Sequence, residues 1–596
     1  MTNFVAPIAL KEMLRNAVHI RTSEIPSMRT DPAVFPAYPP TLPNVIRDVT
    51  QRFGERVFAI QGERRLSYAE LNAQSAHLAR GLLALGVGKA TRVGLMMPND
   101  LDWPVAFLAA GRIGAFTVGL STLFQAREIA WALQRADIDT LLVTGRYLHN
   151  DYLDRLEHAL PELKQQSGPQ LFMRSHPYLR RIVVWGAMDD NAADIKQRLW
   201  ALHGPDALHA AADATPQIDA DYLRRIEDQV VPADWVIGIC TSGSTAEPKI
   251  VVHTHGSMVR TTHAFQPYRP MTAADRNVPG MPFFWIGGLN DNLFPVLYAG
   301  ATLVLSLTPR ADDVLDAVQE HGVTRISVWP PQKQALLERA KARGIDLSHI
   351  RFAQMDPKYP DGTPIPASKR RASLLGMTET FGPHSVGLLG EEVPPERAGS
   401  WGHEFEGVER LVVAADAIHK IPRQPLPAGT KGELLIRGFS LMDGYYKRER
   451  GEVFTADGWF PTGDQVHINA DGTSFFHGRH SEMIKTGGAN VAPREVEDAL
   501  QRLPGVREAT VFGCSDELKG EVVVAVVVAR DGADVDPAEL IAKLRSDISA
   551  YKVPQQIVVM DFDAIPRTDS GKPKKNVLKD MVQQQQAAQA EFNRKA

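Results

Sequence analysis

The chain has 596 residues, enough for several domains and a large hydrophobic core. Its formal net charge of -4 excludes the bulk basic field that binding to nucleic acid requires. The two cysteines, Cys240 and Cys514, are too few for a disulfide framework, so we expect a protein of the reducing cytoplasm.

The apolar stretches predict no export signal and no membrane span. Within residues 1–21 the apolar stretch is interrupted by Lys11, Glu12 and Arg15, so it lacks the long apolar region of a signal peptide. The most apolar helical run, Trp103 to Leu120, is interrupted by Arg112 and predicts a buried helix and strand. We therefore expect a cytoplasmic protein without a transmembrane segment.

From about residue 41 to 145 the pattern alternates between helices and apolar strands. Ser67 followed by Glu70 three residues later is a capping box and predicts a helix start. Residues 92–97 and 139–143 are predicted strands. This alternation is typical of parallel sheets with crossover helices, an α/β fold.

The remaining chain is predicted to complete this fold and to add a second domain. Residues 146–232 are more polar and helical, and are interpreted as an excursion from the core. Short apolar runs and glycine turns at 405–470 predict a compact β subdomain. The Asp471-Gly472 turn predicts a boundary between an N-terminal domain (1–470) and an α+β C-terminal domain (471–596).

A loop rich in hydroxyl groups follows the predicted buried strand at 235–240. Residues 241–249 read TSGSTAEPK, with four hydroxyl side chains, a glycine and a lysine. Backbone N–H groups, hydroxyls and a lysine that converge in one loop can hold phosphate. The common P-loop pattern is absent, because Pro248 precedes Lys249 and no Ser or Thr follows it. A polar turn is the alternative for this loop alone.

Four further motifs follow along the chain. They are GMTET at 376–380, the block GELLIRG, GYY and DGWFPTGD between 432 and 464, GRHSEMIKTGGANVAPREVE at 478–497, and PRTDSGK at 566–572. With TSGSTAEPK they resemble, in order, the motifs of the adenylate-forming (AMP-binding) enzyme superfamily, with acyl-CoA synthetases and fatty-acid–CoA ligases as the branch indicated. The resemblance covers about 42–580 and implies a large α/β N-terminal domain and a small mobile C-terminal domain.

The resemblance implies an ATP site and three catalytic residues. Lys572 would stabilise negative charge as a carboxylate attacks the α-phosphorus, Thr378 would contact phosphate, and Glu379 would be the Mg²⁺ ligand. Asp464 would accept hydrogen bonds from the ribose hydroxyls, and Arg479 would bind ribose or phosphate oxygens. The implied ATP-binding set is Thr241, Ser242, Gly243, Ser244, Thr245, Lys249, Gly362, Thr363, Gly376, Met377, Thr378, Asp464 and Arg479.

The resemblance also implies an acyl pocket, a coenzyme A contact and a hinge. The acyl pocket is assigned to Phe284, Trp285, Gly287 and Gly288 in the run PFFWIGG, with Phe283 interpreted as a core aromatic. Trp285 replaces a frequent histidine and would fill volume or gate a tunnel. Gly487 and Gly488 would let the backbone approach the pantetheine chain, and Asp471 fits the hinge position.

Several positions depart from the family pattern. Ala246 replaces a glycine, Leu375 an aromatic residue and Glu482 an aspartate. The segment that follows the predicted adenine loop at Gly362 and Thr363 is too short for both a helix and a strand before Gly376. His253, His255 and His384 show no metal-ligand spacing and are expected to be structural.

The predicted function is ligation of a carboxylic acid, fatty or aromatic, to coenzyme A. The acid would form acyl-AMP with release of pyrophosphate, and rotation of the C-terminal domain about Asp471 would then admit the thiol. ATP, Mg²⁺ and coenzyme A are the expected cofactors, and a homodimer is compatible with the sequence. Delivery to an acyl carrier protein and a non-catalytic acyl- or nucleotide-binding homologue are the alternatives; a kinase is excluded by its missing phosphate motifs.

Overall fold

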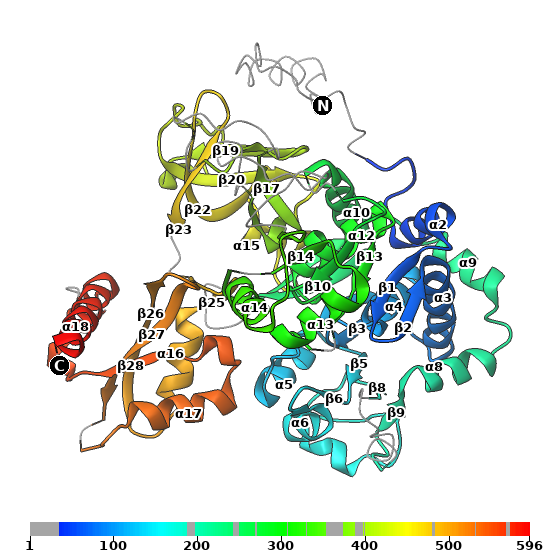
Figure 1. Cartoon of the computed structure of the whole chain (residues 1–596), viewed down its shortest axis with the longest axis horizontal. Coiled ribbons are helices and arrows are strands. Elements are labelled where there is room, and N and C mark those ends of the chain that lie inside the picture. Colours follow the sequence, from blue (N-terminus) through cyan, green and yellow to red (C-terminus); the bar gives the residue numbers. More distant parts are fainter. Residues whose placement is uncertain are drawn as a thin grey trace, which may run out of the picture.

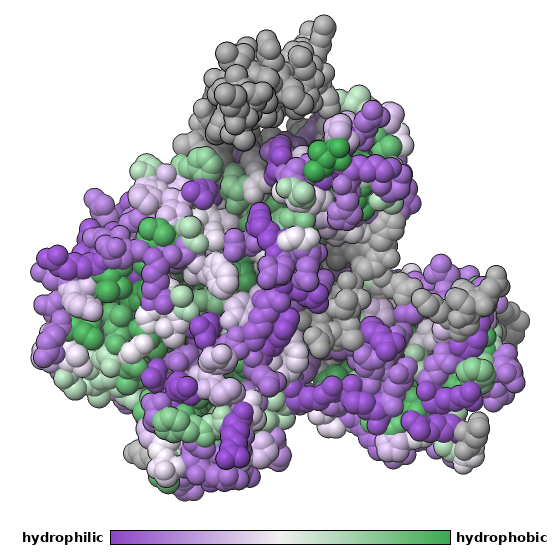
Figure 2. All heavy atoms as spheres, turned by 180° about the vertical axis from the view of Figure 1, so that it is seen from behind, coloured by the Kyte–Doolittle hydropathy of each residue, from purple (hydrophilic) through white to green (hydrophobic). Residues whose placement is uncertain are grey.

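The computed structural model describes residues 35–595 apart from 187–196, 242–248, 269–270, 307, 329, 353–373, 388–396, 398–399, 480–482, 531 and 568–572. Figure 1 shows a large N-terminal domain, blue to yellow, and a smaller C-terminal domain in orange and red. Figure 2 shows the opposite face, where hydrophilic residues predominate on both domains. In the described part of the chain, no helix combines the length and the apolar character that crossing a membrane requires.

An eight-stranded sheet carries most of the site. Its order is β21-β11-β10-β4-β3-β5-β8-β9, and the neighbours from β10 to β9 are parallel, which confirms the α/β expectation. The hairpin β10–β11 and the pair β11–β21 are antiparallel. The strands are β3 (Arg92–Met96), β4 (Phe116–Gly119), β5 (Thr140–Thr144), β8 (Arg181–Trp185), β9 (Ala201–His203), β10 (Trp235–Thr241), β11 (Lys249–Thr254) and β21 (Gly444–Tyr445).

The expectation that residues 146–232 leave the core is wrong in part. Strand β8 pairs in parallel with β5, and β9 extends the sheet beyond β8. The apolar run of β8, RIVVW, covers only five residues, so the average polarity of the region concealed it. The other elements of this region are β6 (Arg146–Tyr147), β7 (Asn150–Asp151), α6 (Tyr152–Ala159), α8 (Gly204–Asp213) and α9 (Ala220–Glu227).

A second sheet of six strands has the order β15-β14-β12-β13-β1-β2, and all its pairs except β1–β2 are parallel. The strands are β1 (Val57–Gln61), β2 (Arg64–Ser67), β12 (Arg276–Pro279), β13 (Thr302–Val304), β14 (Arg325–Ser327) and β15 (Arg351–Phe352). The helices of the two-sheet region are α2 (Leu42–Phe53), α3 (Tyr68–Ala84), α4 (Asp102–Arg112), α5 (Ala126–Arg135), α10 (His255–Ala264), α11 (Ile286–Gly288), α12 (Phe294–Ala299), α13 (Ala311–His321) and α14 (Pro330–Arg343).

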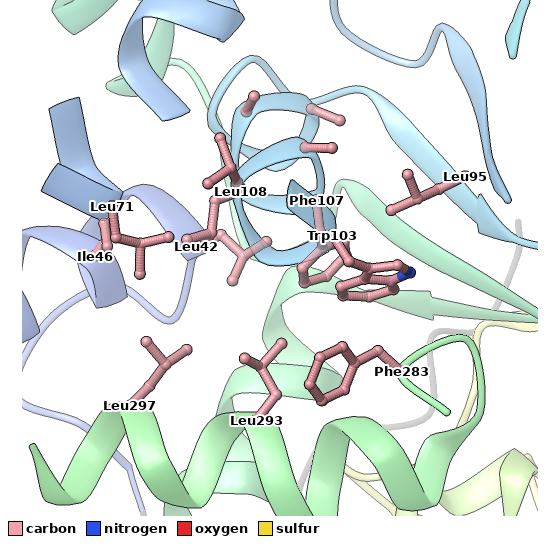
Figure 3. Close-up of a cluster of buried hydrophobic side chains, with 14 of the residues drawn as sticks. Leu42, Ile46, Leu71, Leu95, Trp103, Phe107, Leu108, Phe283, Leu293 and Leu297 are labelled. Atoms are coloured by element: carbon pink, nitrogen blue, oxygen red, sulfur yellow. The ribbon is translucent and has the colours of Figure 1, made fainter. Parts of the chain in front are cut away.

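Local sequence signals place α3 and the central core. Ser67 Oγ accepts a hydrogen bond from the Glu70 amide at 3.1 Å, and the Glu70 carboxylate accepts one from the Ser67 amide at 2.7 Å, so the predicted capping box is confirmed. Figure 3 shows Phe283 and Trp103 directed toward each other in a cluster of buried apolar side chains. Their ring centroids are 5.3 Å apart and both side chains are buried, which confirms Phe283 as a core aromatic.

The β subdomain contains a three-stranded sheet and the four-stranded antiparallel sheet β19-β20-β22-β23. The three-stranded sheet consists of β16 (Leu374–Met377), β17 (Gly382–Val386) and β18 (His403–Glu404). The remaining elements are β19 (Val408–Val413), β20 (Gly432–Gly438), α15 (Arg450–Val453), β22 (Phe460–Ile468) and β23 (Ser474–Arg479).

The predicted boundary at Asp471 is displaced toward the C-terminus. Strand β23 pairs with β22 up to Arg479, so the chain is still part of the N-terminal domain there. Asp471 lies in the β22–β23 turn, where its carboxylate accepts hydrogen bonds from Thr473 and pairs with Arg397 at 2.8 Å. A turn inside one sheet does not lie between two domains, so the structure does not support Asp471 as the hinge; the next sheet begins at Ile484.

The C-terminal domain has the predicted α+β composition. Its sheet has the order β25-β24-β27-β26, with β28 parallel to β27. The elements are β24 (Ile484–Thr486), β25 (Ala489–Val491), α16 (Pro493–Gln501), β26 (Val506–Asp516), β27 (Gly520–Ala529), α17 (Pro537–Asp547), β28 (Gln556–Val559) and α18 (Lys575–Lys595).

Candidate functional site

The β10–β11 hairpin carries the hydroxyl-rich loop. Thr241 and Lys249 are register partners at the loop end of this hairpin, beside the carboxyl ends of β4 and β10. Ligands of open α/β sheets bind at such strand ends. Four predicted phosphate contacts, Ser242, Gly243, Ser244 and Thr245, lie outside the described residues, as do Gly362, Thr363 and Lys572.

Lys249, Tyr445 and Glu379 form a charged cluster next to this loop. Lys249 Nζ lies 4.7 Å from the centroid of the Tyr445 ring, and the Tyr445 hydroxyl donates to Glu379 Oε1 at 2.8 Å. Burial lowers the pKa of Lys249, and the nearby Glu379 carboxylate opposes that shift. The pairing of β11 with β21 brings Tyr445 to the strand that carries Lys249. The cluster therefore places a cation and a carboxylate side by side, as binding of a metal–phosphate complex requires.

Thr378 and Glu379 are positioned by His253, for which the sequence predicts only a structural role. His253 is fully buried, and its Nε2 lies 2.7 Å from the Thr378 carbonyl oxygen. Burial lowers the pKa of His253 to about 4, so the ring is neutral and donates its Nε2 proton to that carbonyl. The Glu379 carbonyl in turn accepts the Met442 amide at 2.8 Å. A histidine within the apolar strand sequence KIVVHT was the available signal.

Glu379 fits the role of a magnesium ligand. Its Oε1 accepts from Tyr445, and within the described residues no donor is recorded for its second oxygen. The described residues contain no group of three or more His, Cys, Asp or Glu that could hold a metal ion. One carboxylate supplemented by phosphate oxygens is a common arrangement for Mg²⁺. A metal at this site would therefore depend on bound nucleotide.

Gly376 and Met377 support the site through packing. A Cβ atom at Gly376 would lie 2.3 Å from the Gly382 carbonyl oxygen, so glycine permits the close β16–β17 hairpin. Met377 packs against an apolar cluster that includes Phe460 and Tyr445. Gly376 and Met377, both predicted to bind ATP, therefore contribute to the packing of the chain next to Thr378.

Asp464 and Arg479 are brought together by strand pairing. They are register partners on β22 and β23, although the predicted ATP-binding role of the Arg479 side chain lies outside what the structure describes. Asp464 is 2 % exposed, and its amide donates to Thr462 Oγ1 at 3.0 Å. The preceding Gly463 has a positive φ of 74° and donates its amide to Glu433 at 2.8 Å. These hydrogen bonds hold the segment of β22 around Asp464 in place.

A cavity of about 510 Å³ lies between the two domains. It brings the predicted acyl-pocket residues Phe284 and Trp285 together with the predicted coenzyme A contact Gly487. The rings of Phe284 and Trp285 meet edge to face at 5.6 Å, and Trp285 meets Tyr551 of the C-terminal domain at 6.3 Å. The apolar part of the wall includes Val278, Leu305, Val328, Leu336 and Val553.

Phe284 and Trp285 also separate this cavity from the end of strand β10. A second hollow of about 20 Å³ is lined by both aromatic residues together with Cys240, Thr241 and Tyr551. The two aromatic side chains therefore stand between the apolar cavity and the end of β10 at Thr241. An acyl group and a phosphate group can meet at this partition.

Gly287 and Gly288 are not among the residues that line the cavity, so their assignment to the acyl wall is not supported. A Cβ at Gly288 would lie 2.0 Å from the Pro282 carbonyl oxygen, and one at Gly287 would lie 2.5 Å from the Met281 sulfur. These glycines permit the tight turn that presents Trp285. Gly487 lines the cavity, and together with Gly488 it forms the β24–β25 turn, in which both have positive φ.

The described flanks of Lys572 lie away from this cavity. Arg567 pairs with Glu508 and Lys575 pairs with Glu497, both within the C-terminal domain. Figure 1 shows α18, which begins at Lys575, on the side of the C-terminal domain that faces away from the N-terminal domain. In this arrangement the Gly487 turn faces the large domain.

Comparison with known proteins identifies both domains. The family model for the AMP-binding enzyme matches residues 46–446, and the model for the AMP-binding enzyme C-terminal domain matches residues 495–572. Residues 447–494, between the two matches, contain both Asp471 and the start of the C-terminal sheet at Ile484.

Two curated relatives and one solved structure extend this comparison. The chain is 28 % identical over 525 residues to the indoleacetate–CoA ligase of Aromatoleum aromaticum, covering 87 % of this chain and 94 % of the relative. It is 30 % identical over 524 residues to the feruloyl-CoA synthase of an Amycolatopsis species, covering 86 % and 93 %. The amide bond synthetase McbA from Marinactinospora thermotolerans has the same fold, with a TM-score of 0.69, 23 % identity and coverage of 91 % and 99 %.

The neutral state of His253 predicts a pH-dependent stability. Its pKa is about 4 in the folded protein and about 6.5 when unfolded, so the unfolded state binds the extra proton as pH falls. His253 therefore contributes stability above pH 6.5 that is lost on acidification, roughly 2 kcal/mol between pH 7 and 5. The test is urea unfolding of His253→Gln, which keeps a donor for the Thr378 carbonyl. Between pH 7 and 5 the free energy of unfolding of this variant should fall by roughly 2 kcal/mol less than that of the unsubstituted protein. Identical losses would contradict the buried neutral assignment.

Proposed function

The chain belongs to the AMP-binding enzymes, and on that premise we propose that it is an ATP-dependent acid–thiol ligase. It converts a carboxylic acid to acyl-AMP with release of pyrophosphate and transfers the acyl group to coenzyme A. One observation carries this proposal: Phe284 and Trp285 separate the strand end at Thr241 from a cavity that the Gly487 turn closes. Nucleotide, acid and thiol can thus approach the Phe284 and Trp285 side chains from different directions.

In the first half-reaction a carboxylate oxygen attacks the α-phosphorus, and the bond from that phosphorus to the bridging oxygen of pyrophosphate breaks. The loop after Thr241 and the Lys249 ammonium would bind the phosphates. Glu379 would hold Mg²⁺, which supplies charge neutralisation at the phosphates when bound. We assign to Lys572 the stabilisation of charge at the α-phosphate, and to Asp464 and Arg479 contacts with ribose and phosphate oxygens.

In the second half-reaction the thiol sulfur attacks the acyl carbon, the bond from that carbon to the AMP oxygen breaks, and the thiol proton is released. The Gly487–Gly488 turn has no side chains, so its backbone can lie close to a pantetheine chain that enters the cavity. The orientation of the C-terminal domain in this structure, with that turn toward the large domain, supports the assignment to acyl transfer. Adenylation would require Lys572 to approach the site by rotation about the connection that follows Arg479.

The cavity favours a fatty or aromatic acid. Its volume of about 510 Å³ falls in the range usual for small-molecule sites, and its wall is apolar around Phe284 and Trp285. The names of the relatives, an indoleacetate–CoA ligase and a feruloyl-CoA synthase, describe ligases for aromatic acids. We further assign the reaction to the cytoplasm, in line with the free cysteines Cys240 and Cys514.

Pyrophosphate release over a panel of fatty and aromatic acids tests this function. With ATP and Mg²⁺, we expect acid-dependent release that falls at least about 100-fold in Lys572→Ala, because one electrostatic contact to a transition state is commonly worth that factor. Lys574→Ala, two residues away, is the matched control and should retain activity. With coenzyme A, a thioester should form.

The other outcomes of this experiment choose between the alternatives. Acid-dependent release without a coenzyme A thioester would favour another acceptor, such as an acyl carrier protein. Nucleotide binding without release for any acid would contradict the proposal and favour a non-catalytic homologue.

The hydrogen bond from Tyr445 to Glu379 predicts a change in nucleotide affinity. Tyr445→Phe should raise the KM for Mg·ATP about tenfold, because a hydrogen bond to a charged group is worth about 1.5 kcal/mol or more. Tyr446→Phe is the matched control, because its hydroxyl contacts Asp137 at 3.0 Å instead. Pyrophosphate release at increasing Mg·ATP measures both. Equal KM values for the two variants would contradict the role given to Glu379.

A further inference from the structure

A buried ion cluster joins helix α5 of the N-terminal domain to the C-terminal domain. Lys552 Nζ lies 2.7 Å from Glu128 Oε1 and 2.7 Å from Glu495 Oε1. The side chains of Lys552, Glu128 and Glu495 are only 3 %, 11 % and 13 % exposed. Glu128 belongs to α5, whereas Glu495 lies on α16 in the same domain as Lys552. Only the contact with Glu128 crosses between the domains.

The Glu128 carboxylate is held from both sides of this interface. On its own helix it accepts the Gln125 amide at 2.8 Å, as part of a capping box. From the C-terminal domain it receives the Ser549 hydroxyl, which lies 2.8 Å from Oε2 and 3.0 Å from Oε1. Two donors from the C-terminal domain, Ser549 and Lys552, therefore converge on one carboxylate whose position is set by the N-terminal domain.

These charges are satisfied only while the domains keep this orientation. Removing ions from water is costly unless they are paired and hydrogen-bonded, and separating a buried pair is strongly unfavourable. Burial lowers the pKa of Lys552, but Tyr551, Glu128 and Glu495 outweigh burial and raise it above its usual value, so the ammonium remains charged. When the C-terminal domain rotates, Lys552 can keep Glu495, whereas Glu128 loses both interdomain donors.

The cluster is directly connected to the cavity. Tyr551, the residue before Lys552, lines the cavity together with Gly487 and packs edge to face against Trp285. Lys552 itself lines the smaller hollow next to Thr241. The contact with Glu128 thus fixes the segment that closes the cavity over the aromatic partition.

We propose that Glu128, Ser549 and Lys552 form an interdomain latch that holds the C-terminal domain in the orientation for acyl transfer to the thiol. These are positioning residues, because they act through the placement of Tyr551 and the Gly487 turn. The latch rests on the proposed two-step function and adds to it a selective requirement: the second half-reaction needs the latch, and the first does not.

An exposed pair at the same interface provides a matched control. Arg127, adjacent to Glu128 on α5, pairs with Asp547 at 3.2 Å, and its side chain is 56 % exposed. Asp547 also pairs with Arg502 of its own domain at 2.8 Å. Exposed ion pairs contribute little to stability. Asp547 also keeps Arg502 as its partner when Arg127 is replaced. Arg127→Gln therefore perturbs the interface without removing a buried charge.

The test measures the two half-reactions separately in the full chain. The first is the burst of pyrophosphate without coenzyme A; the second is single-turnover conversion of preformed enzyme-bound acyl-AMP after addition of coenzyme A. Glu128→Gln and Lys552→Met should each slow the second step about tenfold or more. The first variant leaves buried Lys552 poorly paired, and the second leaves buried Glu128 poorly paired. The burst should stay within about twofold, and Arg127→Gln should match the unsubstituted protein in both steps.

The double variant Glu128→Gln/Lys552→Met should be less impaired than the sum of the single effects, because both changes break the same contact. If Glu128→Gln does not fold, Ser549→Ala carries the test, with an expected slowing of the second step of about threefold for one neutral donor. Thermal unfolding of each variant monitors its fold.

The outcomes distinguish the latch from the function on which it rests. A selective loss in the second step supports the latch. If the unsubstituted protein performs both steps and the variants slow both steps equally, or slow neither, the latch is overturned and the proposed function stands. Absence of a burst in the unsubstituted protein with any acid would overturn the function, and the latch with it.

Discussion

The pairing of β11 with both β10 and β21 is the interaction on which the site depends. The first pairing closes the hairpin that carries the phosphate loop, and the second places Tyr445 against Lys249 and Glu379. The same strand supplies His253, which holds the turn at Thr378. A single strand therefore sets the relative positions of the cation, the carboxylate and the loop, and the register of its hydrogen bonds limits how far these groups can move apart.

The second constraint is electrostatic and concerns the interface between the domains. Mobile domains usually meet through polar surfaces that exchange water easily, whereas here Lys552 and Glu128 are almost fully buried. A buried pair favours one orientation and, once separated, needs rehydration. In the proposed two-step function each half-reaction uses a different face of the C-terminal domain, and a buried pair can stabilise one orientation without making the other inaccessible.

Local signals in the sequence predicted much of the fold but little of the long-range geometry. The capping box at Ser67 acts within a few residues, so the pattern alone identified it. Strand β8 pairs with β5, which lies about 40 residues earlier in the chain, so the polar sequence around it concealed it. The turn at Asp471 was interpreted as a domain boundary, whereas it joins the two strands of the β22–β23 hairpin. The contact of Lys552 with Glu128 joins residues far apart in the chain and has no local signature.

The motifs located Lys249, Glu379 and Asp464, whereas Tyr445 and His253 acquired roles only through their contacts.

Transfer of an oxygen label tests the central claim most directly. A carboxylic acid labelled with ¹⁸O in its carboxylate should be incubated with the enzyme, ATP, Mg²⁺ and coenzyme A, and the nucleotide product analysed by mass spectrometry. Because the attacking carboxylate oxygen stays on phosphorus when the thiol displaces AMP, the account predicts one ¹⁸O atom in AMP for each thioester formed. Thioester formation with unlabelled AMP, or with the label in inorganic phosphate and ADP as the nucleotide product, would contradict an acyl-AMP intermediate.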